Sequence, residues 1–337
     1  MILITGSLGL IGFTACKYYL DRGKDVVGID NDKRKSFLGD KASNFHKLNE
    51  LHSYEKYTHV LKDLQTVSLV DFKDIEMIIH CAAQPSHDYA TDFVLDDFHN
   101  NATATIKLLE GTKRHHPHAL FIFLSSNKVY GDVSAEHKFI EYKTRYDLFE
   151  KHRYYHGFDE TIGIDGRVKS FYGASKASAD LYCQEFANYH GLKTYVLRGS
   201  CLTGSMHSGV EKHGFLSHLV NCHKEKRPYR IIGHQGKQIR DNLHAHDVVR
   251  AFDCIYQQPQ DPGVYNLGGG RDNAYSILEL IEEFLEVEYS YNPVHRIGDF
   301  KWWITDNSKF IKDYPAWQVC ISTRGIMMEM LDDYGIS

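Results

Sequence analysis

Tyr172 and Lys176 are the residues of this sequence whose types and spacing best suit acid–base chemistry. They stand four positions apart, so on a helix both side chains would lie on one face. A tyrosine is a poor base at its ordinary pKa of about 10, and a neighbouring ammonium group favours the phenolate and lowers that pKa. The pair could therefore take a proton from a hydroxyl group, although the same spacing also occurs in surface pairs without chemistry.

A serine hydroxyl is expected to complete this group. Ser126 follows the apolar run 120–124, which predicts a strand. A hydroxyl at the end of that strand could orient a substrate by hydrogen bonding. Ser125 takes this role if the loop is shifted by one residue.

The segment 6–12 has glycines three residues apart and could hold a phosphate group. It follows the short apolar run 2–4, which is typical of a buried strand, and it opens a stretch at about 11–22 that predicts a helix ending near Gly23. Glycines in this position allow a tight turn and a close approach of a pyrophosphate, whose charge is stabilised at the helix N-terminus.

An acidic residue follows at the place where such a site needs one. Asp30 ends the next β-rich run, 25–30, where a carboxylate accepts hydrogen bonds from ribose hydroxyls and repels a 2′-phosphate. Arg34 and Lys33 lie close by, and an arginine can accommodate that phosphate. We expect NAD rather than NADP, and Tyr172 would take a hydroxyl proton while hydride leaves the same carbon.

The elements that must position these residues alternate along the chain. Further β-rich runs at 77–80, 120–124 and 195–197, with a helical stretch at about 100–114, predict an α/β fold with a doubly wound parallel sheet. Glycine-rich breaks and helical pieces at 244–257 and 276–287 follow. We predict a cofactor-binding domain over 1–200, with returning segments from about 236–267, and a mainly substrate-binding domain over 201–337.

Composition excludes several other classes of protein. The 337 residues are 42% hydrophobic and 25% charged with a net charge of −5, which is typical of a soluble globular protein and argues against a nucleic-acid-binding face. No apolar run approaches the ~20 residues that span a bilayer. The seven cysteines are scattered, so we expect reduced thiols and a cytoplasmic location. The histidine clusters lack the spacing of a metal site.

These motifs together resemble a known family. The chain is similar to the extended short-chain dehydrogenases/reductases, in the NAD-dependent nucleotide-sugar epimerase and dehydratase branch. The resemblance implies a Rossmann-like sheet with a smaller C-terminal nucleotide-sugar-binding domain. The resemblance rests on the glycine loop, Asp63-Leu64, Ala82-Ala83, Asn101, Ser126, Tyr172 and Lys176.

Within that branch the chain is most similar to the CDP-paratose (CDP-tyvelose) 2-epimerases. The matching segments are 126–132, 144–146, 159–160, 171–176, 236–241 with His244, and 266–269. Sugar dehydratases of the branch carry an Asp-Glu pair after the catalytic hydroxyl, where this chain has Asn127-Lys128, so elimination of water is disfavoured. Asn127 and Lys128 do not by themselves separate C2 from C4 epimerisation. Segments 84–87, 207–209 and 213–215 depart from the 2-epimerase pattern.

The resemblance implies an isomerase that binds a nucleotide-sugar, with CDP carried over from it, and a homodimer or homotetramer. A 4-epimerase, reductase or dehydratase of the branch and a non-catalytic nucleotide-sugar-binding protein stay open. Trp302-Trp303 could stack on a base or lie in the core. The catalytic residues are expected to be Tyr172, Lys176 and Ser126, and no metal is expected. Cofactor contacts are expected from Gly6, Leu8, Gly9, Leu10, Ile11, Gly12, Asp30, Asn31, Arg34, Asp63, Leu64, Ala82, Ala83, Gln84, Asn101, Ser125, Tyr172 and Lys176. Substrate contacts are expected from Ser86, His87, Asn127, Lys128, Ser200, His213, Phe215, Arg240 and Arg296, with Arg240 the first candidate for the diphosphate because of its guanidinium fork.

Overall fold

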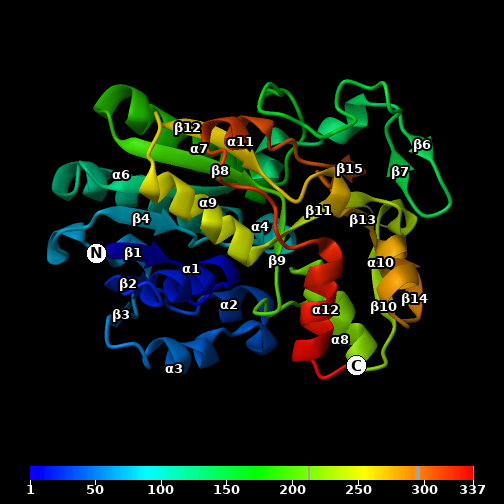
Figure 1. The fold of residues 1–337 in the computed structure, drawn as a ribbon, viewed down its shortest axis with the longest axis horizontal. Helices are drawn as coiled ribbons and strands as arrows, with labels where there is room; N and C mark the ends of the chain where they lie inside the picture. Colours follow the sequence, from blue (N-terminus) through cyan, green and yellow to red (C-terminus); the bar gives the residue numbers. More distant parts are fainter. Residues whose placement is uncertain (212, 293–296, 337) are drawn as a thin grey trace.

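The chain folds around a large parallel sheet, and a smaller region with short sheets lies beside it (Figure 1). The computed structural model describes residues 1–211, 213–292 and 297–336. Within these residues the large sheet has seven strands in the order β12-β8-β5-β4-β1-β2-β3. Their bounds are β1 Ile2–Thr5, β2 Val26–Ile29, β3 Tyr57–Val60, β4 Met77–His80, β5 Leu120–Ser126, β8 Lys193–Gly199 and β12 Gly263–Leu267.

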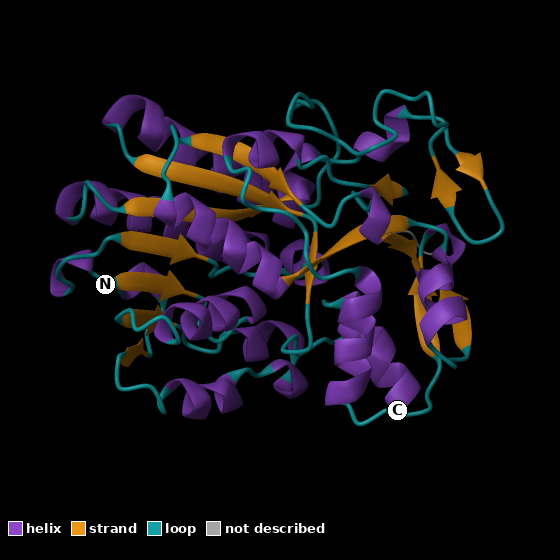
Figure 2. Ribbon diagram, viewed as in Figure 1, coloured by secondary structure: helices purple, strands orange, loops and turns teal. Residues whose placement is uncertain are grey.

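Helices cover both faces of this sheet, which is the doubly wound arrangement expected from the sequence (Figure 2). One apolar cluster joins α1 and α9 to one face, and a second joins α6 and α7 to the other. The helices that flank the large sheet are α1 Leu10–Leu20, α6 Ala104–His115, α7 Phe171–His190, α9 Ala245–Gln257 and α11 Ser308–Asp313. The connections between its strands also contain the short helices α2 Arg34–Leu38, α3 Leu48–Leu51, α4 His87–Asp92 and α5 Val94–Phe98. A π-helical stretch, His99–Thr103, precedes α6 inside the predicted helix.

The strand order reverses between β1 and β4, because β1 pairs with β2 on one side and with β4 on the other. In open α/β sheets ligands bind outside the carboxyl ends of the strands at such a switch point. The glycine loop follows β1, Ala82 follows β4, and Ser126 is the last residue of β5, all at this edge. The topology therefore brings together motifs that lie far apart in the sequence.

The C-terminal part folds around two small sheets (Figure 1). The predicted helical pieces are present as α9 and α10. Trp302 and Trp303 are fully buried, and Trp303 stacks on Tyr130 and Phe300, so the pair belongs to the core. The elements of this part are β9 Cys201–Thr203, β10 Tyr229–Ile232, β11 Ile239–His244, β13 Ala274–Ser276, β14 Tyr289–Asn292, β15 Trp302–Trp303, α8 Phe215–Lys224, α10 Ile277–Phe284 and α12 Thr323–Asp333, while the hairpin β6 Ile140–Glu141 and β7 Tyr146–Asp147 extends from the segment before α7.

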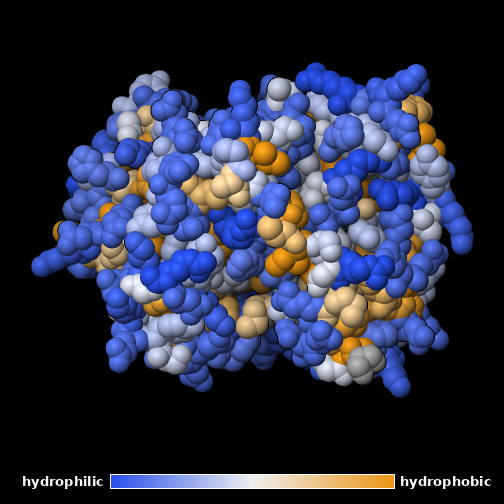
Figure 3. All heavy atoms as spheres, in the orientation of Figure 1, coloured by the Kyte–Doolittle hydropathy of each residue, from blue (hydrophilic) through white to orange (hydrophobic). Residues whose placement is uncertain are grey.

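The chain returns to the large sheet through α9 and β12, and the exact division into two domains stays a prediction. Hydrophilic residues cover most of the face in Figure 3, and apolar residues gather near its middle and beside the C-terminal helices. No helix among the described residues is both long enough and apolar enough to span a membrane.

Candidate active site

A cavity of about 300 Å³ opens at the carboxyl ends of β1, β2, β4 and β5. Most of the residues predicted to contact the cofactor line it, although they come from segments as distant as the glycine loop and α7. The predicted cofactor residues in its wall are Gly6, Gly9, Leu10, Ile11, Gly12, Asp30, Asn31, Arg34, Asp63, Leu64, Ala82, Ala83, Ser125, Tyr172 and Lys176, and Ser126 joins them.

The glycine loop has no room for side chains at two of its glycines. Gly6 has φ +68°, and a Cβ atom there would stand 2.8 Å from the Ala82 nitrogen. A Cβ atom at Gly12 would stand 2.1 Å from the Gly6 carbonyl oxygen. The loop is therefore packed tightly against the first turn of α1, and the backbone at this point leaves a cradle that suits a pyrophosphate.

Gly12→Ala should remove cofactor binding, because the added methyl group would push the Gly6 carbonyl out of the cradle. We expect the NAD content of the purified protein to fall at least about tenfold, since a close backbone approach to the pyrophosphate is lost. The measurement is NAD released on denaturation, per mole of protein. Gly111→Ala on α6 is the matched control, because its Cβ would meet only the flexible side chain of Leu69 at 3.2 Å. Full NAD content in Gly12→Ala would contradict this account of the loop.

Asp30 holds the loop from the neighbouring strand. Its Oδ2 accepts the Leu8 N–H at 3.0 Å, and its Oδ1 accepts the Asp32 N–H at 2.8 Å. Burial raises the pKa of Asp30, and these two hydrogen bonds oppose that rise. Each carboxylate oxygen has further lone pairs, so Asp30 can still accept from the ribose hydroxyls of a dinucleotide.

Two N–H groups of Arg34 already have partners in the C-terminal part. Its Nη2 donates to the Ser208 carbonyl at 2.8 Å, and its Nη1 lies 3.1 Å from His213 Nδ1. A guanidinium that is committed in this way does not favour NADP, so the residues around the cavity fit NAD.

Tyr172 and Ser126 meet at the wall of this cavity. Tyr172 lies on the first turn of α7, where Ser170 caps the helix by accepting the Gly173 N–H at 3.1 Å. Burial raises the pKa of Tyr172 to about 12, and the nearby Ser126 hydroxyl works in the opposite direction. Ser126 Oγ also accepts the Lys128 N–H at 3.2 Å. A positive charge in the cavity, such as that of an oxidised nicotinamide, would lower this pKa further and favour the phenolate.

Lys176 lies one turn after Tyr172 on the same helix, as predicted from the spacing. Its Nζ donates to the Leu124 carbonyl at 2.7 Å and lies 4.1 Å from the centre of the Phe123 ring. Burial lowers the pKa of Lys176 to about 8. The ammonium group is thus fixed at the end of β5, and its predicted contact with the nicotinamide ribose remains a prediction.

Three predicted cofactor contacts are not among the residues that line the cavity. Gln84 Nε2 donates to Asp97 at 2.8 Å, and Asn101 Nδ2 donates to the Gln84 carbonyl at 3.1 Å and to Ser175 at 3.0 Å. Leu8 is fully buried and offers only its N–H to Asp30. Their contacts with the cofactor stay predictions, and the structure places the three residues behind the lining of the cavity, where Gln84 and Asn101 have protein partners.

The comparisons with known proteins agree with this geometry. The family model described as the NAD dependent epimerase/dehydratase family matches residues 2–268. The chain belongs to the NAD-dependent epimerase/dehydratase family. NAD is accordingly its cofactor, and when bound it supplies a reversible acceptor of hydride.

Relatives of this NAD-dependent epimerase/dehydratase differ in their reactions. The chain is 30% identical to a CDP-paratose 2-epimerase of Salmonella typhi over 98% of both chains. It is 26% identical to a UDP-glucuronate 4-epimerase of Thermodesulfobacterium geofontis, over 83% of this chain and 78% of that protein. It is 25% identical to a dTDP-glucose 4,6-dehydratase of Salmonella typhimurium, over 86% and 79%. The crystal structure of UDP-glucuronic acid 4-epimerase from Bacillus cereus with UDP-glucuronic acid and NAD shares the fold, with a TM-score of 0.77, 21% identity and coverage of 99% and 98%.

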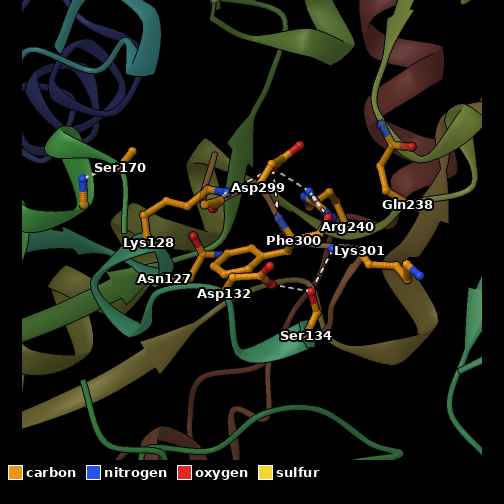
Figure 4. A network of polar contacts seen from close by, with 12 residues as sticks. Asn127, Lys128, Asp132, Ser134, Ser170, Gln238, Arg240, Asp299, Phe300 and Lys301 are labelled. Carbon is orange, nitrogen blue, oxygen red and sulfur yellow. Dashed lines mark hydrogen bonds and ion pairs between the residues drawn. The ribbon is translucent and has the colours of Figure 1, made fainter. Parts of the chain in front are cut away.

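A partly buried charge cluster lies beside the turn that follows Ser126 (Figure 4). Asp299 Oδ1 lies 3.0 Å from Lys128 Nζ and 2.7 Å from Arg240 Nη2. Burial alone would raise the pKa of Asp299, but Lys128 and Arg240 outweigh burial and hold it well below its usual range. Two cations share one carboxylate, so the cluster carries excess positive charge and suits an anionic substrate group. Asp299 was not predicted from the sequence, although it stands only three residues after Arg296.

Of the other predicted substrate residues, His87, Asn127 and Ser200 lie near Tyr172, Ser126 or the cavity. His87 lies beside the catalytic tyrosine, with ring centroids of His87 and Tyr172 5.0 Å apart, and Asn127 begins the turn after Ser126. Ser200 lines the cavity. Arg296 lies outside the described residues.

The remaining three substrate contacts stay predictions, and each of these side chains has other contacts in the structure. Ser86 is buried and caps α4 by accepting the Tyr89 N–H at 3.2 Å. Phe215 packs against the apolar cluster of the C-terminal part. His213 lines the cofactor cavity and contacts Arg34, so it lies on the cofactor side. Each of these side chains takes the nearest partner in the folded chain, which the sequence order does not reveal.

Proposed function

We propose that this family member is an NAD-dependent nucleotide-sugar epimerase that inverts C2 of a CDP-linked sugar of the paratose type. The observation that carries the proposal is that Ser126, Tyr172 and Lys176 line one cavity together with the glycine loop and Asp30. The similarity over 98% of a CDP-paratose 2-epimerase supports the choice of sugar and carbon.

Tyr172 would act as the base that takes the proton from the 2-hydroxyl group as hydride leaves C2. Ser126 would hold the same oxygen through its own hydroxyl and keep it near the phenolate. The resulting 2-keto sugar would turn in the site, and return of the hydride to its other face would invert the centre. Tyr172 would then give the proton back, so that protons and electrons balance over one cycle.

Lys128 and Arg240 would bind the diphosphate while the sugar turns. The partly buried cluster offers this excess positive charge close to Ser126, because Lys128 lies in the turn Asn127–Tyr130 that directly follows it. Neither Asn127 nor Lys128 can act as the carboxylic acid that the dehydratases of the family place at these positions, so elimination of water lacks its acid. The cytoplasmic location and the dimeric or tetrameric state belong to the same proposal.

The test is a panel of CDP-, UDP-, GDP- and dTDP-sugars, CDP-paratose first, with products identified by NMR. We expect one C2 epimer, no net consumption of NAD, and no solvent deuterium at C2 when the reaction runs in D₂O. Inversion at C4 would replace the proposal with a 4-epimerase. A dehydrated product, net NADH formation or deuterium at C2 would overturn the direct return of hydride, and no reaction with any sugar would favour a binding protein.

A further inference from the structure

A loop of the C-terminal part lies across the segment that follows β2. We call it the cover loop and define it as residues 205–211 with His213 and Gly214; Lys212 is outside the described residues. Lys47 Nζ donates to the Met206 carbonyl at 2.7 Å, and Ser208 Oγ donates to Asn44 Oδ1 at 2.8 Å. In Figure 1 the chain between β9 and α8 passes beside α2. The loop therefore connects the two parts of the molecule.

The cover loop forms one wall of the cofactor cavity. His207, Ser208 and His213 line the same cavity as Asp30 and Arg34. The Arg34 guanidinium joins the two sides, through the Ser208 carbonyl at 2.8 Å and His213 Nδ1 at 3.1 Å. Because Asp30 stands where the family site reads the adenosine ribose, this wall lies at the adenosine end of the cavity.

The other side of the cover loop is fixed to the C-terminal part. Ser205 donates to Glu329 on α12 at 2.6 Å, and Ser217 on α8 donates to the His207 carbonyl at 2.7 Å. Gly214 has φ +84°, and a Cβ atom there would stand 2.7 Å from His207 Cε1. The loop thus has a defined shape that is held from both ends.

Charge and hydrogen bonding also point to a ligand beneath the loop. Burial lowers the pKa of His207 to about 3 and that of His213 well below its usual range, with Arg34 adding to both effects. Both imidazoles are therefore neutral and do not repel the Arg34 cation. Arg34 Nε is buried without a hydrogen-bond partner among the described residues. A buried donor without a partner is rare in a folded protein, so the Arg34 guanidinium keeps unused hydrogen-bonding capacity beneath the loop.

We propose that the cover loop closes the adenosine end of the NAD site, so that His213, Ser208 and Arg34 retain the cofactor between turnovers. NAD can then leave only when the contacts from Arg34, Asn44 and Lys47 to the loop have broken. The proposal assigns His213 to the cofactor rather than to the nucleotide-sugar. It does not depend on which sugar the enzyme converts.

The first test compares rates of NAD release. Holoenzyme is diluted into alcohol dehydrogenase and ethanol, which convert each released NAD to NADH. We expect Ser208→Ala/His213→Ala to release NAD at least tenfold faster than the unmodified protein, with CDP and UDP binding unchanged by calorimetry. His115→Ala, which removes an exposed histidine at the end of α6, is the matched control. An unchanged rate in a folded double variant, or lost CDP binding with normal NAD retention, would overturn the proposal.

A second test locks the loop and does not depend on weakening the fold. The pair Asn44→Cys/Ser208→Cys replaces a side-chain contact of 2.8 Å with two thiols, and mass spectrometry selects the cross-linked form. The two single cysteine variants are the controls. We expect the cross-linked holoenzyme to release NAD at least tenfold more slowly, and reduction to restore the rate. Equal rates before and after reduction would show that the loop does not control release, whatever sugar is converted.

Discussion

Tyr172→Phe should lower turnover by between about 10² and 10⁴-fold, the range that a positioned acid–base group contributes, while NAD stays bound. The phenyl ring keeps the packing at the start of α7 and loses only the hydroxyl group, which would take the proton from the substrate. The measurement is kcat with the sugar identified by NMR, together with the NAD content of the purified variant.

Tyr189→Phe is the matched control for this change. Tyr189 stands on the same helix and is 79% exposed, so its hydroxyl group touches no part of the cavity and turnover should not change. Near-normal activity of Tyr172→Phe would contradict the assignment of Tyr172 as the base. Loss of bound NAD together with activity would instead indicate damage to the cavity wall.

The pH profile of turnover tests whether Ser126 lowers the pKa of Tyr172. Turnover requires deprotonated Tyr172, so the rate should rise as pH approaches the pKa of that group. The nearby Ser126 hydroxyl lowers this pKa, and Ser126→Ala should therefore shift the rise to higher pH. If Ser126→Ala lowers the rate but does not shift the pH profile, then Ser126 only orients the substrate and does not lower the pKa of Tyr172.

The sequence was sufficient for features that depend on local spacing. The apolar runs at 2–4, 77–80 and 120–124 are strands of the large sheet, because short runs between turn residues have few other stable states. Tyr172 and Lys176 share a helix face because residues four positions apart lie on one side of a helix. The glycines of the loop could be placed because each stands at a fixed distance from a strand end.

Partners that are distant in the sequence could not be predicted in this way. Asp299 pairs with Lys128 across the active site, and His213 reaches Arg34 across the cofactor cavity. Asn101, whose contact with the cofactor stays a prediction, bonds to Gln84 and Ser175. A buried polar group takes whatever partner the tertiary fold brings within reach, and residue spacing carries no information about that choice.

A buried ion pair behind the catalytic residues also escaped the sequence reasoning. Arg198 on β8 binds both oxygens of Asp180 on α7 at 2.9 Å, and both side chains are almost fully buried. Ser125 Oγ donates to Asp180 at 2.7 Å, and Arg198 Nη1 donates to Tyr130 Oη at 3.0 Å. Ser125 and Tyr130 stand on either side of the catalytic turn that includes Lys128, so the pair ties this turn to α7.

Asp180→Leu should lower the free energy of unfolding by about 3–5 kcal/mol, because it leaves the buried Arg198 cation without its partner. Denaturant unfolding of the holoenzyme measures the loss, and Asp40→Asn is the control, since Asp40 pairs with Lys35 at the surface and such pairs contribute at most about 1 kcal/mol. The double variant Asp180→Leu/Arg198→Met removes both charges and should recover most of the stability, as buried pairs often exchange for apolar residues at little cost. Turnover of both the single and the double variant should be lower than that of the unmodified protein, because Ser125 and Tyr130 lose the partners that hold the turn beside Tyr172. Recovery of both stability and turnover would show that the pair contributes to folding alone, and a small loss in Asp180→Leu would mean that water reaches Arg198 and replaces the carboxylate.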